Sequence, residues 1–357
     1  MLNKFRGSMI GGLVGDCLGA PFEFKYQENL VPTKKIVTFL EDVKNLEEEN
    51  QRAPDDQFQY TDDTAMARQI AITFVEKKSL DPAELARNFT KEYFREQWRG
   101  YGGSVVEVFD KLRKSNFSDP FKPASEQFDG SGSYGNGAGM RAHSIGLVCC
   151  SQSETETVRT AESVARLTHS HHLGVTGGVL QALAVHQALH SLKPRDSLTR
   201  IRSLCSEREK EMEGDTLFRH KLEVLERFLS TDGDVDHEDV AFELGNGVSA
   251  VDSVPTALYC CLSVLDNAKY SQEEKFEAVL KLAIRMGGDT DTIASMACAI
   301  AGAHLGLDSI PPHLYSVCEG YREMIDLADQ MYLTVFPEAG EDLNTGDKPS
   351  PKRTKLS

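Results

Sequence analysis

Apolar residues recur along most of the chain at the spacing of amphipathic helices. Near the start, Phe5, Met9 and Leu13 fall on one helical face. Two later stretches, residues 172–191 and 253–265, are apolar nearly all round, which is typical of helices buried at the centre of a bundle. We find no internal repeat and no strand-like alternation between turn signals. The pattern therefore predicts an all-α fold of many helices.

Helix start signals precede several of these periodic runs. Capping-box patterns, in which a capping residue is followed three positions later by a glutamate, occur at Asp81 with Glu84, Ser153 with Glu156 and Ser271 with Glu274. The acid-rich residues 41–56 are most simply an exposed loop without chemistry. No linker divides the chain, so we expect one domain over residues 1–337 and a disordered basic tail over residues 338–357.

Composition and charge narrow the class of protein. The 357 residues are 40% hydrophobic and contain no apolar run long enough to cross a bilayer, which favours a globular protein without a membrane partner. The net charge of -16 opposes adhesion to nucleic acid. Eight cysteines without CxxC spacing resemble buried hydrophobes of a reducing compartment. We expect a monomer.

The ends of the chain bear on its location. The first residues lack the hydrophobic core of a signal peptide, which argues against secretion. The basic residues 351–355 could be a nuclear localisation signal or simply part of a solvated tail. We expect the cytoplasm and the nucleus, and the mitochondrial matrix stays open.

Two short acid-rich segments, residues 61–64 and 287–292, lie more than two hundred residues apart, and each runs into a helix of small residues. Threonine and aspartate are ordinary helix N-caps, and the helix dipole favours acids in the first turn. A cap needs only one or two polar side chains, whereas these segments offer four aspartates and four threonines. Because hard oxygen ligands suit divalent cations, the segments predict a shared metal site between helix ends.

A glycine-rich stretch, residues 128–141, also feeds a predicted helix. Five glycines within residues 130–139 allow positive φ and close approach to a ligand, and a following helix start offers free N–H groups to an anion. Phe128 and Tyr134 flank the glycines, so a nucleotide base could stack on them. The spacing matches neither the P-loop nor the dinucleotide fingerprint, so a structural turn and a phosphate loop both stay open. The shorter run of residues 99–104 could line the same pocket.

Three histidines are clustered at His169, His171 and His172. Clustered histidines can ligate a metal, but a histidine at a helix end can also cap carbonyls or bind a phosphate. Because carboxylates already supply the metal site, we favour ligand contact for His169 and surface roles for the other two.

Four motifs stand in a fixed order along the chain. They are GDCLGAPFE at Gly15 to Glu23, YTDDTAMA at Tyr60 to Ala67, GSYGNGAGMR at Gly132 to Arg141, and MGGDTDTIASMACAIAG at Met286 to Gly302. Together they resemble the ADP-ribosylglycohydrolase family, and most closely its serine-directed vertebrate members. The resemblance runs from about Phe5 to Phe336, and it implies an all-α globule with two Mg²⁺ ions.

The resemblance also implies roles for individual residues. The two Mg²⁺ ions would be held by Thr61, Asp62, Asp63, Asp289, Asp291 and Thr292. Glu23 would lie on a mobile segment that closes over the metals, and the catalytic group would be Glu23, Asp62, Asp63 and Asp289. Phe128 and Tyr134 would stack the adenine. The diphosphate and riboses would contact Gly132, Ser133, Gly135, Asn136 and His169, and further pocket residues would be Gly100, Gly102, Gly247 and Val248.

The implied reaction is Mg²⁺-dependent hydrolysis of the C1″–O bond that joins ADP-ribose to serine on proteins. Poly(ADP-ribose) and O-acetyl-ADP-ribose would be related substrates, and the role would be reversal of DNA-damage-linked ADP-ribosylation. An oxocarbenium-like transition state needs an oriented ribose, an assisted leaving oxygen and a placed water. Which carboxylate is the acid and which the base stays open. The alternatives are an arginine-directed ADP-ribosylhydrolase, a phosphodiesterase that cuts the pyrophosphate, and a non-catalytic ADP-ribose reader.

Overall fold

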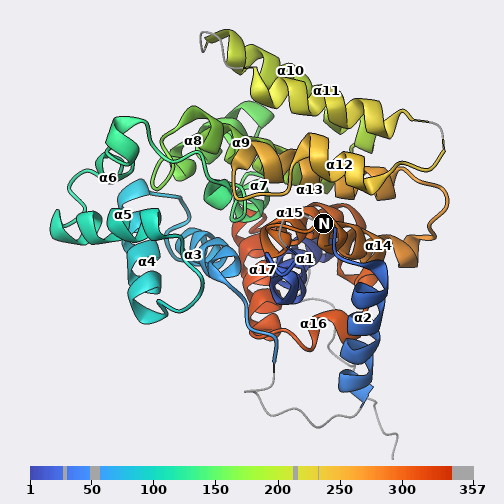
Figure 1. Cartoon of the computed structure of the whole chain (residues 1–357). Coiled ribbons are helices and arrows are strands. Elements are labelled where there is room, and N and C mark those ends of the chain that lie inside the picture. The colour runs from blue at the N-terminus through green and yellow to red at the C-terminus, as the bar shows by residue number, and fades with distance from the viewer. Residues whose placement is uncertain (27–29, 49–56, 212–215, 232, 340–357) are drawn as a thin grey trace, which may run out of the picture.

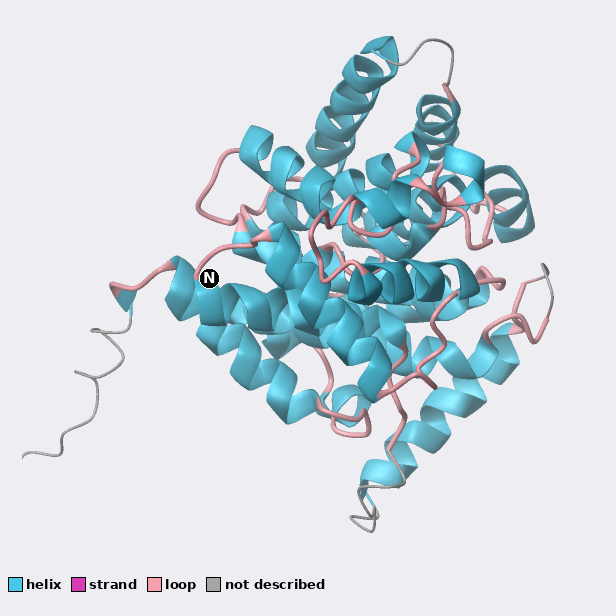
Figure 2. Cartoon of the chain, turned by 90° about the vertical axis from the view of Figure 1, so that its left-hand side faces the viewer, coloured by secondary structure: helices cyan, strands magenta, loops and turns pink. Residues whose placement is uncertain are grey.

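Helices make up nearly all the regular structure of the chain in a computed structural model that describes residues 1–26, 30–48, 57–211, 216–231 and 233–339 (Figures 1 and 2). Within these ranges no strand forms, and strand-like pairing is limited to two isolated bridges. The all-α prediction is confirmed. The expected basic tail lies outside the described residues from residue 340 onward.

The helices of the first half of the chain follow one another from the N-terminus. They are α1 (Leu2–Gly19), η1 (Ala20–Phe22), α2 (Thr33–Glu48), α3 (Asp62–Lys77), α4 (Pro82–Arg95), α5 (Gly103–Lys114), α6 (Lys122–Ser125), η3 (Phe128–Gly130), η4 (Asn136–Ala138), α7 (His143–Val148) and α8 (Glu154–Ala165), where η marks a 3₁₀ helix.

The second half of the chain contains the apolar central helices. Its elements are α9 (His172–Leu189), α10 (Pro194–Glu211), α11 (Leu217–Leu229), α12 (His237–Leu244), α13 (Ala250–Leu265), α14 (Gln272–Arg285), α15 (Thr290–Leu305), η5 (Leu307–Ser309), α16 (Pro312–Tyr315) and α17 (Tyr321–Val335).

The three predicted helix starts are confirmed. Asp81 and Ser153 each accept a hydrogen bond from the backbone N–H of the glutamate three residues on, and Ser271 forms a full capping box. The loop predicted over residues 41–56 is wrong in its first half, because α2 continues to Glu48. The physical reason is a buried stripe at Ile36, Leu40 and Val43, which holds α2 on the core. Residues 49–56 lie outside the described residues.

The antiparallel pair of α1 and α15 forms the centre of the molecule (Figure 1). On α1, glycine occupies every fourth position, at Gly7, Gly11, Gly15 and Gly19. A Cβ on Gly11 would lie 2.2 Å from the carbonyl oxygen of Cys298, and one on Gly15 would lie 2.2 Å from that of Ala294. The two backbones therefore touch along this stripe, as only glycine permits. This packing brings the end of α1 beside the start of α15.

Other apolar helices surround this pair. The predicted buried helices are confirmed as α9 and α13, which pack on each other and on α15. All eight cysteines are buried free thiols, as their apolar contexts predict. None of the described helices combines the length and the apolar character needed to cross a membrane.

Candidate metal centre and ligand pocket

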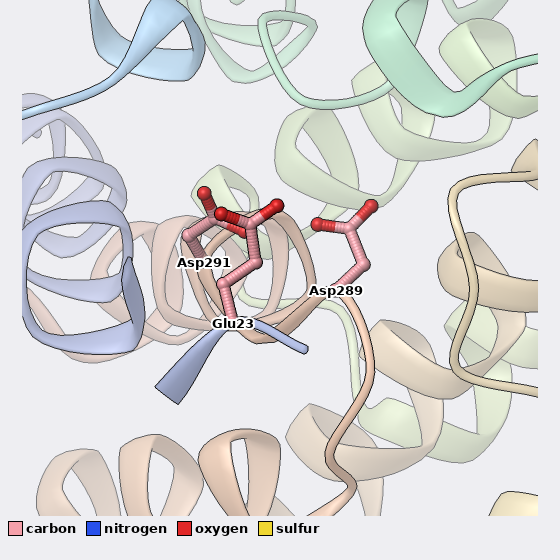
Figure 3. Close-up of side chains that lie close together, drawn as sticks. All are labelled: Glu23, Asp289 and Asp291. Carbon is pink, nitrogen blue, oxygen red and sulfur yellow. The ribbon is translucent and has the colours of Figure 1, made fainter. Parts of the chain in front are cut away.

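Three carboxylates converge where the end of α1 meets the start of α15. One carboxylate oxygen from each of Glu23, Asp289 and Asp291 lies within 4.8 Å of the others. Figure 3 shows the three side chains pointing into the same space from two segments of the chain. The two aspartates are buried and Glu23 is exposed. Carboxylate oxygens are the ligands that hard divalent cations prefer, so this cluster could hold one.

A tight glycine turn fixes the start of α15. Gly287 and Gly288 take positive φ values of 71° and 65°, which favour glycine. A Cβ on Gly288 would lie 2.1 Å from the carbonyl oxygen of Asn246. That same oxygen accepts the N–H of Asp289 at 2.8 Å, while the oxygen of Gly288 accepts the N–H of Phe24 at 2.9 Å. The turn thus holds the Glu23 segment against the aspartates.

The second acid-rich segment joins the same site. Thr61 caps α3 and accepts the N–H of Asp63 at 3.3 Å, while Asp62 and Asp63 occupy the first helical turn. The hydroxyl of Thr292 donates to Oδ1 of Asp63 at 3.3 Å, so the two segments meet. Oδ2 of Asp63 is buried and has no hydrogen-bond partner in the described part of the chain. A buried carboxylate oxygen without a donor fits a cation ligand.

Burial and mutual repulsion shape the electrostatics of these carboxylates. Burial, followed by the charge of Asp16, raises the pKa of Asp62 to about 8. Burial and neighbouring carboxylates also raise the pKa of Asp63 and Asp291 well above the ordinary value, and that of Glu23 is raised for the same reasons. A bound divalent cation would relieve this repulsion. We call Glu23, Asp62, Asp63, Asp289 and Asp291 the acid centre.

Asp16, to which the sequence analysis gave no role, accepts hydrogen bonds from backbone N–H groups at the start of α3. It is fully buried in α1, and both carboxylate oxygens lie 3.1 Å from the N–H of Thr61. Its Oδ2 also accepts the N–H of Thr64 at 3.1 Å. The signal in the sequence is a carboxylate inside the apolar, glycine-rich second half of α1, where a charge requires partners.

Arg99, which we expected only as part of the run of residues 99–104 that could line the pocket, holds the same helix end. Its guanidinium donates to the carbonyl of Tyr60 at 2.8 Å and forms a two-point ion pair with Glu319 at 2.6 and 2.9 Å. Its own carbonyl accepts the N–H of Asp62 at 2.8 Å. The rings of Tyr60 and Trp98 lie 3.7 and 4.0 Å from the guanidinium carbon. Asp62 is therefore placed by a rigid, satisfied cation.

The glycine-rich stretch lies directly beside the acid centre. Asn136 donates through its side-chain amide to the carboxylate of Asp289 at 2.6 Å. Its backbone N–H donates to the carbonyl of Val248 at 2.9 Å, and Gly135 pairs with Ser249 in one of the isolated bridges. Residues 247–249, which include the predicted Gly247 and Val248, thus line the stretch. We call residues 128–139 the glycine-aromatic loop.

The predicted stacking residues are open to solvent. The side chains of Phe128 and Tyr134 are 57% and 55% exposed, which leaves their faces available to a ligand. Phe128 and Asp129 take φ values of 51° and 55°, a left-handed conformation that aspartate tolerates but that is costly for phenylalanine. Val248 is exposed as well, at 56%. These side chains form the open rim of the site.

The remaining predicted residues differ in what they contact. Gly132 has a φ of 78°, and a Cβ there would lie 2.1 Å from the hydroxyl of Ser170. The hydroxyl of Ser133 accepts the N–H of Gly135 at 3.3 Å. Gly100 has a φ of 89°, and a Cβ there would lie 3.7 Å from a carboxylate oxygen of Asp62, whereas Gly102 and Gly247 face open space. His169 is buried against the glycine-aromatic loop.

A large cavity elsewhere carries none of the predicted residues. Its volume is ≈ 1020 Å³, and it is lined by parts of α2, α11, α13 and α14. The candidate site is identified instead by its converging carboxylates, none of which line this cavity.

The chain is similar in sequence to a known protein family and to several of its members. A family model described as ADP-ribosylglycohydrolase matches residues 1–341. The chain is 39% identical to ADP-ribosylhydrolase ARH3 of Danio rerio over 96% of this chain and 94% of that protein, and 38% identical to the protein of the same name from Homo sapiens over 93% of each. A solved structure titled "ADP-ribosylglycohydrolase-related protein complex" shares the fold, with a TM-score of 0.65 and 19% identity over 94% of this chain and 99% of that one.

Proposed function

The chain belongs to the ADP-ribosylglycohydrolase family, and from that premise we propose that it is a Mg²⁺-dependent enzyme that removes ADP-ribose from serine on proteins. Membership and the relatives named ADP-ribosylhydrolase make it an ADP-ribosylhydrolase. The serine linkage, together with poly(ADP-ribose) and O-acetyl-ADP-ribose as further substrates, is our proposal. The observation that carries the proposed metal-dependent hydrolysis is the meeting of two acid-rich helix starts beside an open glycine-aromatic loop.

We propose that two magnesium ions bind the acid centre, whose oxygen donors suit a hard divalent cation. Magnesium prefers oxygen ligands in a compact arrangement, and Asp63 offers a buried carboxylate oxygen without a donor. When bound, the ions would orient the ribose hydroxyls and lower the pKa of a coordinated water. The residues proposed to hold them are Thr61, Asp62, Asp63, Asp289, Asp291 and Thr292.

The proposed hydrolysis breaks the C1″–O bond to serine and forms a C1″–O bond to water. The water loses a proton, and the serine oxygen gains one. Glu23 is the exposed member of the acid centre, so its carboxyl can reach the leaving oxygen of a bulky protein substrate. The buried Asp63 and Asp289 and the half-buried Asp62 can orient the water and accept its proton, because protein covers them largely from bulk solvent.

The glycine-aromatic loop would bind the rest of the substrate. The exposed rings of Phe128 and Tyr134 would stack the adenine. The glycine backbone and His169 would hold the diphosphate, since backbone N–H groups of such loops bind anions well. The open faces of Gly100, Gly102, Gly247 and Val248 would line the riboses.

A release assay tests this proposal. Purified protein is incubated with serine-linked and arginine-linked ADP-ribosyl peptides, with and without Mg²⁺, and the products are identified. We expect free ADP-ribose from the serine-linked peptide in the presence of Mg²⁺, and loss of activity in Asp62→Asn and Asp289→Asn. Turnover of the arginine-linked peptide alone would favour the arginine-directed activity. AMP would indicate a phosphodiesterase, and binding without turnover a reader.

We also propose a cellular setting for this activity. Reversal of ADP-ribosylation linked to DNA damage would place the protein in the nucleus and the cytoplasm, with the mitochondrial matrix as a further compartment. The basic residues 351–355 and the eight buried thiols support a reducing, nuclear and cytoplasmic location. A fluorescent fusion with and without residues 351–355 checks the nuclear part. Equal nuclear fluorescence from both fusions would show that residues 351–355 are not a nuclear localisation signal.

A further inference from the structure

A chain of three buried side chains lies behind the glycine-aromatic loop. Nη2 of Arg141 donates to Oγ1 of Thr168 at 2.7 Å, and that oxygen lies 2.7 Å from Nδ1 of His169. The exposed fractions of the three residues are 0%, 0% and 7%. A buried hydroxyl therefore connects a fixed cation to a histidine ring.

The chemistry of arginine sets the direction of these hydrogen bonds. A guanidinium donates and cannot accept, so Oγ1 of Thr168 accepts from Arg141. The single hydroxyl proton remains for another acceptor. Among the described residues the other polar partner of this hydroxyl is Nδ1 of His169. In the reverse arrangement, a buried hydroxyl proton would have no partner, which is unfavourable. Nδ1 is therefore the acceptor.

A neutral imidazole with an acceptor at Nδ1 carries its proton on Nε2. The ring of His169 is neutral, because burial, together with the charge of Arg141, lowers its pKa to about 3. Burial lowers the pKa of Arg141 to about 9, so this side chain keeps its charge at neutral pH. Both partners thus hold fixed protonation states.

The protonated nitrogen faces the glycine-aromatic loop. A Cβ on Gly137 would lie 3.0 Å from Nε2 of His169, and one on Gly135 would lie 3.5 Å away. Within the described ranges of the chain, Nε2 has no hydrogen-bond partner. Nη1 of Arg141 also donates to the carbonyl of Gly137 at 2.6 Å, so one guanidinium fixes both the loop and the ring.

We propose that Arg141 and Thr168 are positioning residues that lock His169 in the tautomer with its proton on Nε2, so that it always presents a donor to an anionic oxygen of the ligand. The nitrogen lone pair of the other tautomer would repel that oxygen. The identification of this oxygen as part of the ADP-ribose diphosphate rests on the proposed function. The tautomer does not, because it follows from the ligand-free protein.

Nitrogen NMR on the ligand-free full chain tests the lock directly. Long-range ¹H–¹⁵N correlation of histidine-labelled protein separates protonated from unprotonated ring nitrogens, and the resonances lost in His169→Gln identify this ring. We expect Nε2 to be protonated and Nδ1 unprotonated. A proton on Nδ1, or an even mixture, would overturn the proposal. This measurement needs no variant with an altered Thr168.

A matched pair of variants then tests the role of the hydroxyl. Thr168→Val removes it at nearly constant size, and Thr168→Ser keeps it. We expect a mixture of tautomers and about tenfold weaker binding of free ADP-ribose in the valine variant, with wild-type behaviour in the serine variant, because the donor faces a charged acceptor. Thermal melting reports whether each variant is folded.

The outcomes separate the two proposals. A valine variant with the wild-type tautomer and wild-type affinity would overturn the lock. If the wild-type protein holds the Nε2–H tautomer but does not bind ADP-ribose, the lock is supported and the proposed function fails. If the serine variant loses the tautomer while remaining folded, the hydroxyl is not the element that sets it, and the lock is overturned.

Discussion

The acid centre and the glycine-aromatic loop lie side by side, yet they are built in opposite ways. In the acid centre, three of the five carboxylates are buried, and the helix ends that carry them are fixed by touching backbones and by the partners Asp16 and Arg99. In the glycine-aromatic loop, the side chains of Phe128 and Tyr134 are more than half exposed, and the backbone takes positive φ values over Phe128–Gly130 and at Gly132. The difference separates chemistry, which needs fixed buried charge, from recognition, which needs open surface.

The largest expected effect is on the acid centre. Asp291→Asn keeps the shape of the side chain but removes its negative charge, so kcat/KM for a serine-linked ADP-ribosyl peptide should fall by about a thousandfold. Steady-state kinetics measure the loss. Asp42→Asn, at an exposed position of α2, is the control and should keep full activity. Full activity in Asp291→Asn would mean that the acid centre is not the chemical half of the site.

The next effect concerns the packing of α1 against α15, which places Glu23 beside the aspartates of the acid centre. Gly11→Ala places a methyl group 2.2 Å from the carbonyl oxygen of Cys298, so the free energy of unfolding should fall by about 3 kcal/mol. Gly103→Ala is the matched control, because a Cβ there meets nothing within 4 Å at the start of α5. It should be neutral or stabilising by up to about 1 kcal/mol. Denaturant unfolding that found the two variants equal would contradict the close contact of α1 with α15.

A smaller effect is expected in the glycine-aromatic loop. Tyr134→Ala should weaken ADP-ribose binding by about tenfold through loss of stacking, with kcat nearly unchanged. Stability should change little, because the ring is 55% exposed and the bond from the N–H of Ala250 to the carbonyl of Tyr134 is retained. Tyr134→Phe keeps the ring and should bind as the wild type does. A fall in kcat at constant affinity would assign chemistry, not recognition, to this loop.

The smallest effect is a pH dependence of the metal-free protein. The pKa of Asp62 is raised from 3.8 to about 8 in the folded chain, so its contribution to stability is present below about pH 4 and is lost as the pH rises through about 8. The melting temperature at pH 8 should therefore gain a few degrees in Asp62→Asn, and less at pH 5. Mg²⁺ should stabilise the wild type more at pH 8 than at pH 5. Identical pH profiles of the melting temperature for both proteins would show that the pKa of Asp62 is not raised in the folded chain.

Several features of the fold and of the site could be predicted from the sequence alone. The helical class, three capped helix starts and the buried helices α9 and α13 follow from local periodicity and capping chemistry, and they are confirmed. The meeting of the two acid-rich segments could be inferred, because too many carboxylates and hydroxyls stood at helix starts for capping alone. The contact of Thr292 with Asp63 bears that out.

Local sequence patterns could not predict which helices and side chains lie against one another in the folded chain. The glycine stripe of α1 has meaning only once α15 lies against it, and Asp16 and Arg99 matter only through the helix end that they hold. Over residues 41–48 the acidic composition hid the buried stripe of α2, and the loop prediction failed there. The tautomer of His169 likewise depends on Arg141, which is 28 positions away by residue number (169 − 141) but is linked to it through one hydroxyl.

Calorimetric titration of Mg²⁺ into the ligand-free protein, Asp63→Asn and Asp291→Asn tests the central claim most directly. The two substitutions lie on helices whose starts meet only in the folded chain. If both helices share one metal centre, the wild type should bind two ions and each variant should lose or greatly weaken binding. Wild-type binding in either variant, or no binding by the wild type, would contradict the account.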